Sequence, residues 1–128
     1  MGDARKILIA DDSPTIVEIT KAMLKEEGHE IVTASNGAEA LAKIQEEKPD
    51  LVLLDVMMPE MDGYTTLQTL RRDAKSGDAD YVRVIVITSK DKMRDLVELE
   101  GVDGFLVKPF VRSELIEAIN KVFAQGSG

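Results

Sequence analysis

The chain has 128 residues, of which 44% are hydrophobic and 31% charged, the composition of one globular domain rather than of a disordered segment. Its net charge of −8 argues against direct contact with nucleic acid, and no apolar run is long enough to cross a membrane or to serve as a signal peptide. The absence of cysteine excludes disulfides and thiolate metal sites, and it favours a cytoplasmic location.

Short apolar segments alternate along the chain with segments whose apolar residues have helical spacing. Pro14 suits the first turn of a helix and Gly28 the position after its end, whereas the polar residues 73–80 predict a loop. In chain order, the pattern predicts a strand at residues 6–10, a helix at 14–27, a strand at 30–34, a helix at 38–47, a strand at 51–54, a helix at 64–72, a strand at 82–88, a helix at 93–99, a strand at 105–107 and a helix at 113–124.

Five strands alternating with five helices predict an α/β fold in which helices cover both faces of a parallel sheet. Right-handed crossovers favour a doubly wound, flavodoxin-like (βα)5 arrangement with strand order 2-1-3-4-5. We expect residues 1–125 to form a single domain, and we interpret residues 126–128 as a linker stub or a remnant of cloning. Ligands of such sheets bind beyond the carboxyl ends of the strands.

Polar side chains stand where the predicted strands end. Asp11 and Asp12 follow the first strand, Asp55 follows the third, Thr88 ends the fourth and Lys108 follows the fifth. Each has an ordinary explanation by itself, since an Asp after a strand is usually a helix cap and a lone Lys is usually exposed. Together, however, they place three carboxylates at one edge of the sheet. Clustered carboxylates repel one another unless a cation joins them or their pKa values rise. A hard cation that prefers oxygen ligands meets that need, which indicates a site for Mg2+, with Mn2+ as a substitute.

Four segments resemble the signature segments of response-regulator receiver domains: ILIADDS (7–13), DLVLLDVMMPEMDG (50–63), VIVITS (84–89) and DGFLVKPF (103–110). The resemblance covers roughly residues 5–124, nearly the whole chain. It implies a phosphorelay protein of two-component signalling, similar to the chemotaxis regulators. Such a domain is not a conventional enzyme, because it catalyses only its own phosphorylation and dephosphorylation.

The resemblance also implies a set of metal ligands. Asp55 is implied to be the phosphoacceptor and, together with Asp12, a direct ligand of Mg2+. Asp11 is implied to act mainly through metal-bound water, and Met57 to contribute its backbone carbonyl.

The remaining polar groups are implied to handle the phosphoryl group and the switch. Thr88 and Lys108 would hold the phosphoryl oxygens, and the bond between Lys108 and Pro109 is expected to be cis. Phe105 occupies the aromatic switch position of the family. Phosphorylation would draw Thr88 inward and open space into which Phe105 turns, and the surface of the fourth helix, fifth strand and fifth helix would then change its partner preference.

The expected phosphodonor is a sensor histidine kinase, a phosphotransfer protein or a small molecule such as acetyl phosphate. The expected recipient of the signal is a downstream protein or an output domain, with neither nucleic acid nor membrane as a direct partner. The chain itself is expected to be a monomer or a weak, phosphorylation-dependent dimer.

Three other functions compete with this one. A pseudo-receiver would act only through protein contacts, and the complete set of polar groups argues against it. A haloacid-dehalogenase-type phosphatase needs a second Asp two residues after the nucleophile, where this chain has Met57. A flavin-binding module needs a phosphate-cradling loop after the first strand, which the sequence lacks.

Two positions are predicted to set the lifetime of the phosphoryl group. In the family, the residues two after the phosphoacceptor and two after the Thr flank the approach of the hydrolytic water; here they are Met57 and Lys90. Met57 can shield the phosphoryl group with its apolar side chain, and Lys90 cannot accept a proton from the water. The sequence therefore predicts a comparatively long-lived phosphoryl group.

Overall fold

The computed structural model describes residues 4–56, 63–89, 92 and 101–125. Its elements, in chain order, are β1 (Lys6–Ala10), α1 (Pro14–Glu26), β2 (Glu30–Ala34), α2 (Gly37–Glu47), β3 (Leu51–Asp55), α3 (Gly63–Ser76), β4 (Arg83–Ser89), β5 (Gly104–Lys108) and α5 (Arg112–Gln125). The helix predicted at residues 93–99 lies outside the described residues, as do Met57, Lys90 and residues 126–128. None of the described helices is long and apolar enough to cross a membrane.

The strands form one parallel sheet in the order β2-β1-β3-β4-β5, which confirms the predicted doubly wound topology. Strand β1 lies between β2 and β3, with Ala10 opposite both Ala34 and Leu54. The order of strands along the sheet reverses here, so the carboxyl ends of β1 and β3 lie side by side at the point where such folds bind their ligands. Strand β5 is at the edge and pairs with β4.

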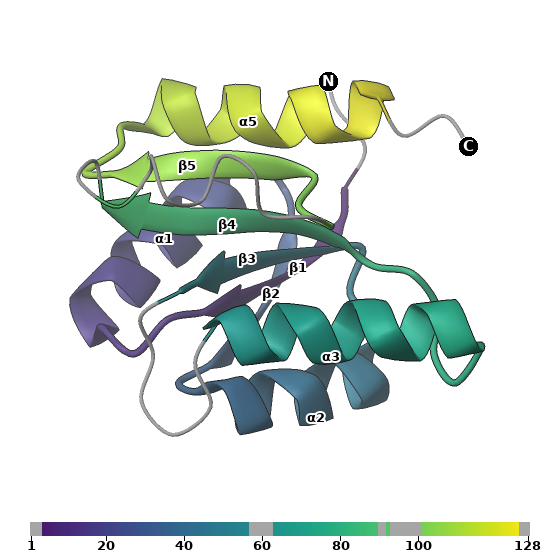
Figure 1. The fold of residues 1–128 in the computed structure, drawn as a ribbon. Coiled ribbons are helices and arrows are strands. Elements are labelled where there is room, and N and C mark those ends of the chain that lie inside the picture. Colours follow the sequence, from purple (N-terminus) through teal and green to yellow (C-terminus); the bar gives the residue numbers. More distant parts are fainter. Residues whose placement is uncertain (1–3, 57–62, 90–91, 93–100, 126–128) are drawn as a thin grey trace.

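Helices cover both faces of the sheet, with α1 and α5 on one side and α2 and α3 on the other (Figure 1). Alternate residues of each strand enter the two cores. On β1, Leu8 faces the core under α2 and α3, whereas Ile7 and Ile9 pack in the core that also contains Leu24 and Leu115. Strand β3 is buried along its whole length, which explains why its sequence is an unbroken apolar run before the final Asp.

Helix α3 corrects one prediction, because it continues to Ser76 and occupies the first half of the loop predicted at residues 73–80. These residues lack an apolar stripe, so periodicity alone misses the last turn. The residue after the helix is Gly77, whose φ of +85° is left-handed, and the N–H of Asp78 donates to the carbonyl of Asp73 at 2.9 Å, as in a Schellman motif. The other described elements agree with the prediction to within a residue at each end.

Candidate functional site

The carboxyl ends of β1 and β3 bring three carboxylates together. Asp11 follows β1 directly, Asp12 is the next residue, and Asp55 is the last residue of β3. Each offers one oxygen, and these oxygens lie within 4.8 Å of one another. Asp11 and Asp55 are only 2% and 5% exposed, whereas Asp12 is exposed. The fold therefore gathers the acids that the sequence places after two separate strands.

The turn after β1 fixes the orientation of Asp11. Its backbone N–H donates to the carbonyl of Ala34 on β2 at 3.1 Å. Its Oδ1 accepts the N–H of Ser13 at 2.9 Å, and Ser13 caps α1 by accepting the N–H of Ile16 on its own hydroxyl. Because Oδ1 is used within this turn, Oδ2 is the oxygen that faces Lys108.

Lys108, at the end of β5, supplies a cation to the site. Its Nζ lies 3.0 Å from Oδ2 of Asp11 and donates to Oδ2 of Asp55 at 3.1 Å. Burial by itself lowers the pKa of Lys108, but the carboxylates of Asp11 and Asp55 outweigh it, so the pKa lies above its usual value. The charged amine thus offsets the repulsion between two buried carboxylates. The peptide bond to Pro109 is cis, as expected.

Thr88 and Phe105 share one face of the sheet. Thr88 is 2% exposed, and its hydroxyl donates a long hydrogen bond, at 3.5 Å, to the carbonyl of Ser89. Phe105 is opposite Val86 on β4 and packs, partly buried, against the core under α2 and α3, to which Val86 also belongs. Because side chains alternate along a strand, Thr88 points to the same face as Val86. The two residues of the expected switch therefore occupy neighbouring positions on that face.

Gly63, the first residue of α3, contacts the backbone at the end of β3. A Cβ at this position would lie 2.5 Å from the carbonyl oxygen of Asp55 and 2.5 Å from Cα of Val56. The N–H of Gly63 donates to the carbonyl of Val56 at 3.3 Å. Only Gly permits this close approach. In the sequence Gly63 is merely a loop breaker before a helical pattern, so its contact with Asp55 is a finding of the structure.

The acid cluster has the chemistry of a site for a hard divalent cation. Oδ2 of Asp11 is buried, and none of the described residues donates a hydrogen bond to it, although Lys108 lies within ion-pair distance. Such an oxygen is suited to accept from a metal-bound water. Mg2+ binds oxygen at about 2.1 Å, so two of its direct ligands are at most about 4.2 Å apart, and a cluster whose oxygens lie within 4.8 Å of one another suits an ion that one carboxylate contacts through a metal-bound water. The all-oxygen donor set therefore fits Mg2+ or Mn2+.

Comparison with known proteins finds one family. A family model described as the response regulator receiver domain matches residues 7–120. Protein PilH of Pseudomonas aeruginosa is 38% identical over 121 residues, which cover 93% of this chain and 98% of PilH. Chemotaxis protein CheY of Bacillus subtilis is 38% identical over 122 residues, which cover 92% of this chain and 97% of that protein.

Solved structures show the same likeness in three dimensions. The response regulator protein TrrA of Thermotoga maritima, in complex with Mg(2+)-BeF, superposes with a TM-score of 0.80 at 36% identity. The match covers 92% of this chain and 98% of that one. The likeness thus includes nearly the whole of both chains.

Proposed function

The chain belongs to the response regulator receiver domain family, and on that premise we propose that it accepts a phosphoryl group on Asp55 in a Mg2+-dependent reaction. The position of Lys108 carries this proposal, because its ammonium lies 3.1 Å from Oδ2 of Asp55 and 3.0 Å from Oδ2 of Asp11. A buried carboxylate at the end of a central strand thereby has a fixed cation and further acids beside it, which phosphoryl transfer requires. Receiver domains are signalling proteins, so we expect the phosphorylated domain to transmit a signal.

The transfer itself needs little covalent chemistry from the chain. A carboxylate oxygen of Asp55 attacks the phosphorus of a phosphohistidine or an acyl phosphate, and the bond from phosphorus to the donor's nitrogen or oxygen breaks. Lys108 then pairs with a phosphoryl oxygen, and Thr88 donates its hydroxyl to another. The donor is proposed to be a sensor histidine kinase, a phosphotransfer protein or a small acyl phosphate. Most of the catalysis lies in positioning and charge.

The metal would be held by the acid cluster. Asp12 and Asp55 would bind Mg2+ directly, Asp11 through metal-bound water and Met57 through its carbonyl. When bound, the ion neutralises negative charge on the incoming phosphoryl group. The support for this arrangement is the buried Oδ2 of Asp11, which has the Lys108 ammonium beside it, and the closeness of the three carboxylates.

The output of the domain is proposed to depend on Thr88 and Phe105. Movement of Thr88 toward the phosphoryl group would free space on the face that it shares with Phe105, and rotation of Phe105 would alter the surface that includes β5 and α5. Phe105 has no hydroxyl, so its two positions would differ through packing alone. A downstream protein or an output domain would bind one of the two states better.

Intact mass after incubation with acetyl phosphate and Mg2+ tests the proposal. Wild type is expected to gain one phosphoryl group, and Asp55→Asn or chelation of Mg2+ is expected to abolish the gain. Asp78→Asn, an exposed change at the end of α3, is the matched control and should label as wild type does. Labelling of Asp55→Asn at the wild-type rate would refute the assignment of the nucleophile. A wild type that binds Mg2+ but gains no mass would favour the pseudo-receiver.

A further inference from the structure

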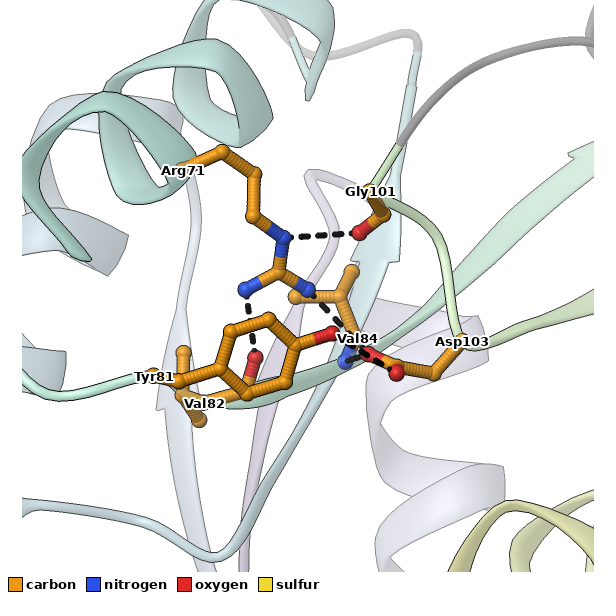
Figure 2. Close-up of polar contacts among 6 residues, drawn as sticks. All are labelled: Arg71, Tyr81, Val82, Val84, Gly101 and Asp103. Atoms are coloured by element: carbon orange, nitrogen blue, oxygen red, sulfur yellow. Dashed lines mark hydrogen bonds and ion pairs between the residues drawn. The ribbon is translucent and has the colours of Figure 1, made fainter. Parts of the chain in front are cut away.

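The side chain of Arg71, in α3, joins segments at the amino ends of β4 and β5 (Figure 2). Its Nε donates to the carbonyl of Gly101 at 2.7 Å, Nη1 to the carbonyl of Val82 at 2.7 Å, and Nη2 to Oδ2 of Asp103 at 3.1 Å. The guanidinium carbon also lies 4.1 Å from the centre of the Tyr81 ring. The guanidinium of Arg71 therefore holds the segments that precede β4 and β5, through the hydrogen bonds of its three nitrogens and the contact of its plane with the Tyr81 ring.

Asp103 ties this cluster to β4 through both its main chain and its side chain. Its N–H donates to the carbonyl of Val84 at 2.9 Å, and the N–H of Val84 donates to Oδ2 of Asp103 at 2.8 Å. Its Oδ1 accepts the hydroxyl of Tyr81 at 2.8 Å. The next residue, Gly104, begins β5 and lies opposite Ile85. Asp103 therefore fixes which residue of β4 stands at the start of the β5 ladder.

We call the cluster of Arg71, Tyr81 and Asp103 the anchor. Strand β5 depends on the anchor more than the inner strands do. It is an edge strand of five residues in the described sheet, so the ladder to β4 is its single backbone pairing there. Because the two strands are parallel, no tight turn between them sets the register. A shift of one residue would move every side chain of β5 to the opposite face. The observed register places Lys108 opposite Ser89, at the edge where the acids lie.

Helix α3 connects this anchor with the phosphoacceptor. Its first residue, Gly63, lies against the backbone of Asp55 and Val56, and Arg71 lies about two turns further along. The helix runs from the carboxyl edge of the sheet, where the acids lie, toward the amino edge (Figure 1). One helix therefore contacts the end of β3 directly and the start of β5 through the guanidinium of Arg71.

We propose that Arg71 and Asp103 are positioning residues for Lys108. They hold the start of β5 in register against β4, and thereby keep the Lys108 ammonium between Asp11 and Asp55. This inference rests on the proposed function, since the position of Lys108 affects phosphorylation only if Asp55 is the phosphoacceptor. The carboxylates of the acid cluster follow or end β1 and β3, so the ligand set for Mg2+ does not depend on the anchor, and displacement of the Lys108 ammonium is expected to leave Mg2+ binding as tight as in wild type or tighter.

Arg71→Lys tests the proposal, because it keeps the charge and loses the forked donors. The matched control is Arg72→Lys on the same helix, where the side chain is 74% exposed and pairs with Asp73. In Arg71→Lys, amide hydrogen exchange in β5 should accelerate by about tenfold or more while exchange in β1 stays unchanged. The rate of phosphorylation by acetyl phosphate should fall by about fivefold or more, while Mg2+ binds no more weakly than to wild type.

A double variant separates positioning from general damage. In a Lys108→Met background, Arg71→Lys should lower the phosphorylation rate no further, because both changes act through the same amine. An equal fall in both backgrounds, or a loss of Mg2+ affinity that matches the loss of rate, would overturn the proposal. If Arg71→Lys fails to fold, Tyr81→Phe removes one hydrogen bond to Asp103 and should give a smaller effect in the same direction.

The outcomes also distinguish this inference from the proposed function. If wild type is phosphorylated and Arg71→Lys is phosphorylated at the same rate, the positioning role is refuted and the function stands. If wild type gains no phosphoryl group, the proposed function fails. Hydrogen exchange then still decides whether the anchor holds β5, and unchanged exchange in Arg71→Lys would refute the anchor as well.

Discussion

The ammonium of Lys108 lies 3.1 Å from Oδ2 of Asp55, although β5 and β3 are not neighbours in the sheet and β4 lies between them. The side chain of Lys108 therefore reaches past the end of β4, where Thr88 and Ser89 stand opposite the last residues of β5. The same ammonium also lies 3.0 Å from Asp11, which follows a third strand. One flexible amine thus connects the ends of three strands.

Loss of Lys108 should destabilise the metal-free protein in a pH-dependent way. Lys108→Met leaves two buried carboxylates without their cation, which should cost about 1–3 kcal/mol of unfolding free energy at neutral pH. The folded-state pKa of Lys108 is raised, so its contribution is fully present below the unfolded pKa of about 10.4 and is lost as the pH rises through the folded value. Urea unfolding should therefore show a difference between the two proteins that is constant up to about pH 10 and shrinks above it.

The control for this measurement is Lys121→Met, which removes an exposed amine from α5 and should leave stability nearly unchanged. A difference between wild type and Lys108→Met that persists undiminished in strong alkali would show that the charge of Lys108 does not stabilise the fold.

Mg2+ should raise the melting temperature, because under the proposed function it would bind the assembled acid cluster and not the dispersed acids of the unfolded chain. At a concentration one hundred times Kd the gain should be about 2.7 kcal/mol. Asp12→Ala should weaken this gain, and in EDTA it should be slightly more stable than wild type because one repulsion is removed. Glu18→Ala, an exposed change on α1, serves as the control in paired thermal melts. A wild-type melting temperature that does not change when Mg2+ is added would count against the metal site.

Gly63→Ala should damage the site through steric overlap. The added Cβ would meet the backbone of Asp55 and Val56, and the resulting shift should cost about 1–3 kcal/mol and slow phosphorylation. Gly28→Ala is the contrast: its φ of +90° makes it costly by about 1 kcal/mol, but open space surrounds it and the site lies elsewhere. Urea unfolding and phosphorylation rates would be measured on both. If the two variants slowed phosphorylation alike, the contact with Asp55 would not be the reason.

The lifetime of the aspartyl phosphate should depend on Met57 and Lys90, which are expected to flank the approach of the hydrolytic water. The double variant Met57→Asn with Lys90→Glu should lose its phosphoryl group faster than wild type, because both new side chains can accept a hydrogen bond from the attacking water. Its Kd for Mg2+ should change little, since Met57 is expected to use its backbone carbonyl alone. Decay would be followed by intact mass after removal of the phosphodonor, and equal decay rates would show that these side chains do not set the lifetime.

Much of the fold could be read from local patterns. The run LVLL (51–54) is apolar at every position, which a strand buried on both faces requires, and the acid that follows must then lie at the carboxyl edge of the sheet. The alternation of strands with helices favoured the observed strand order, since right-handed crossovers leave few alternatives. The gathering of Asp11, Asp12 and Asp55 follows from these two facts.

Tertiary packing decided the rest. No local pattern shows that Gly63 contacts the backbone at the end of β3, or that the side chain of Arg71 binds Gly101 and Asp103. Periodicity in a sequence indicates which side of a single helix or strand is buried, because the side chains that share one side of an element are only a few residues apart in the sequence. The partners of Arg71 and the reach of Lys108 past β4 depend on how separate elements pack, and no local pattern carries that information.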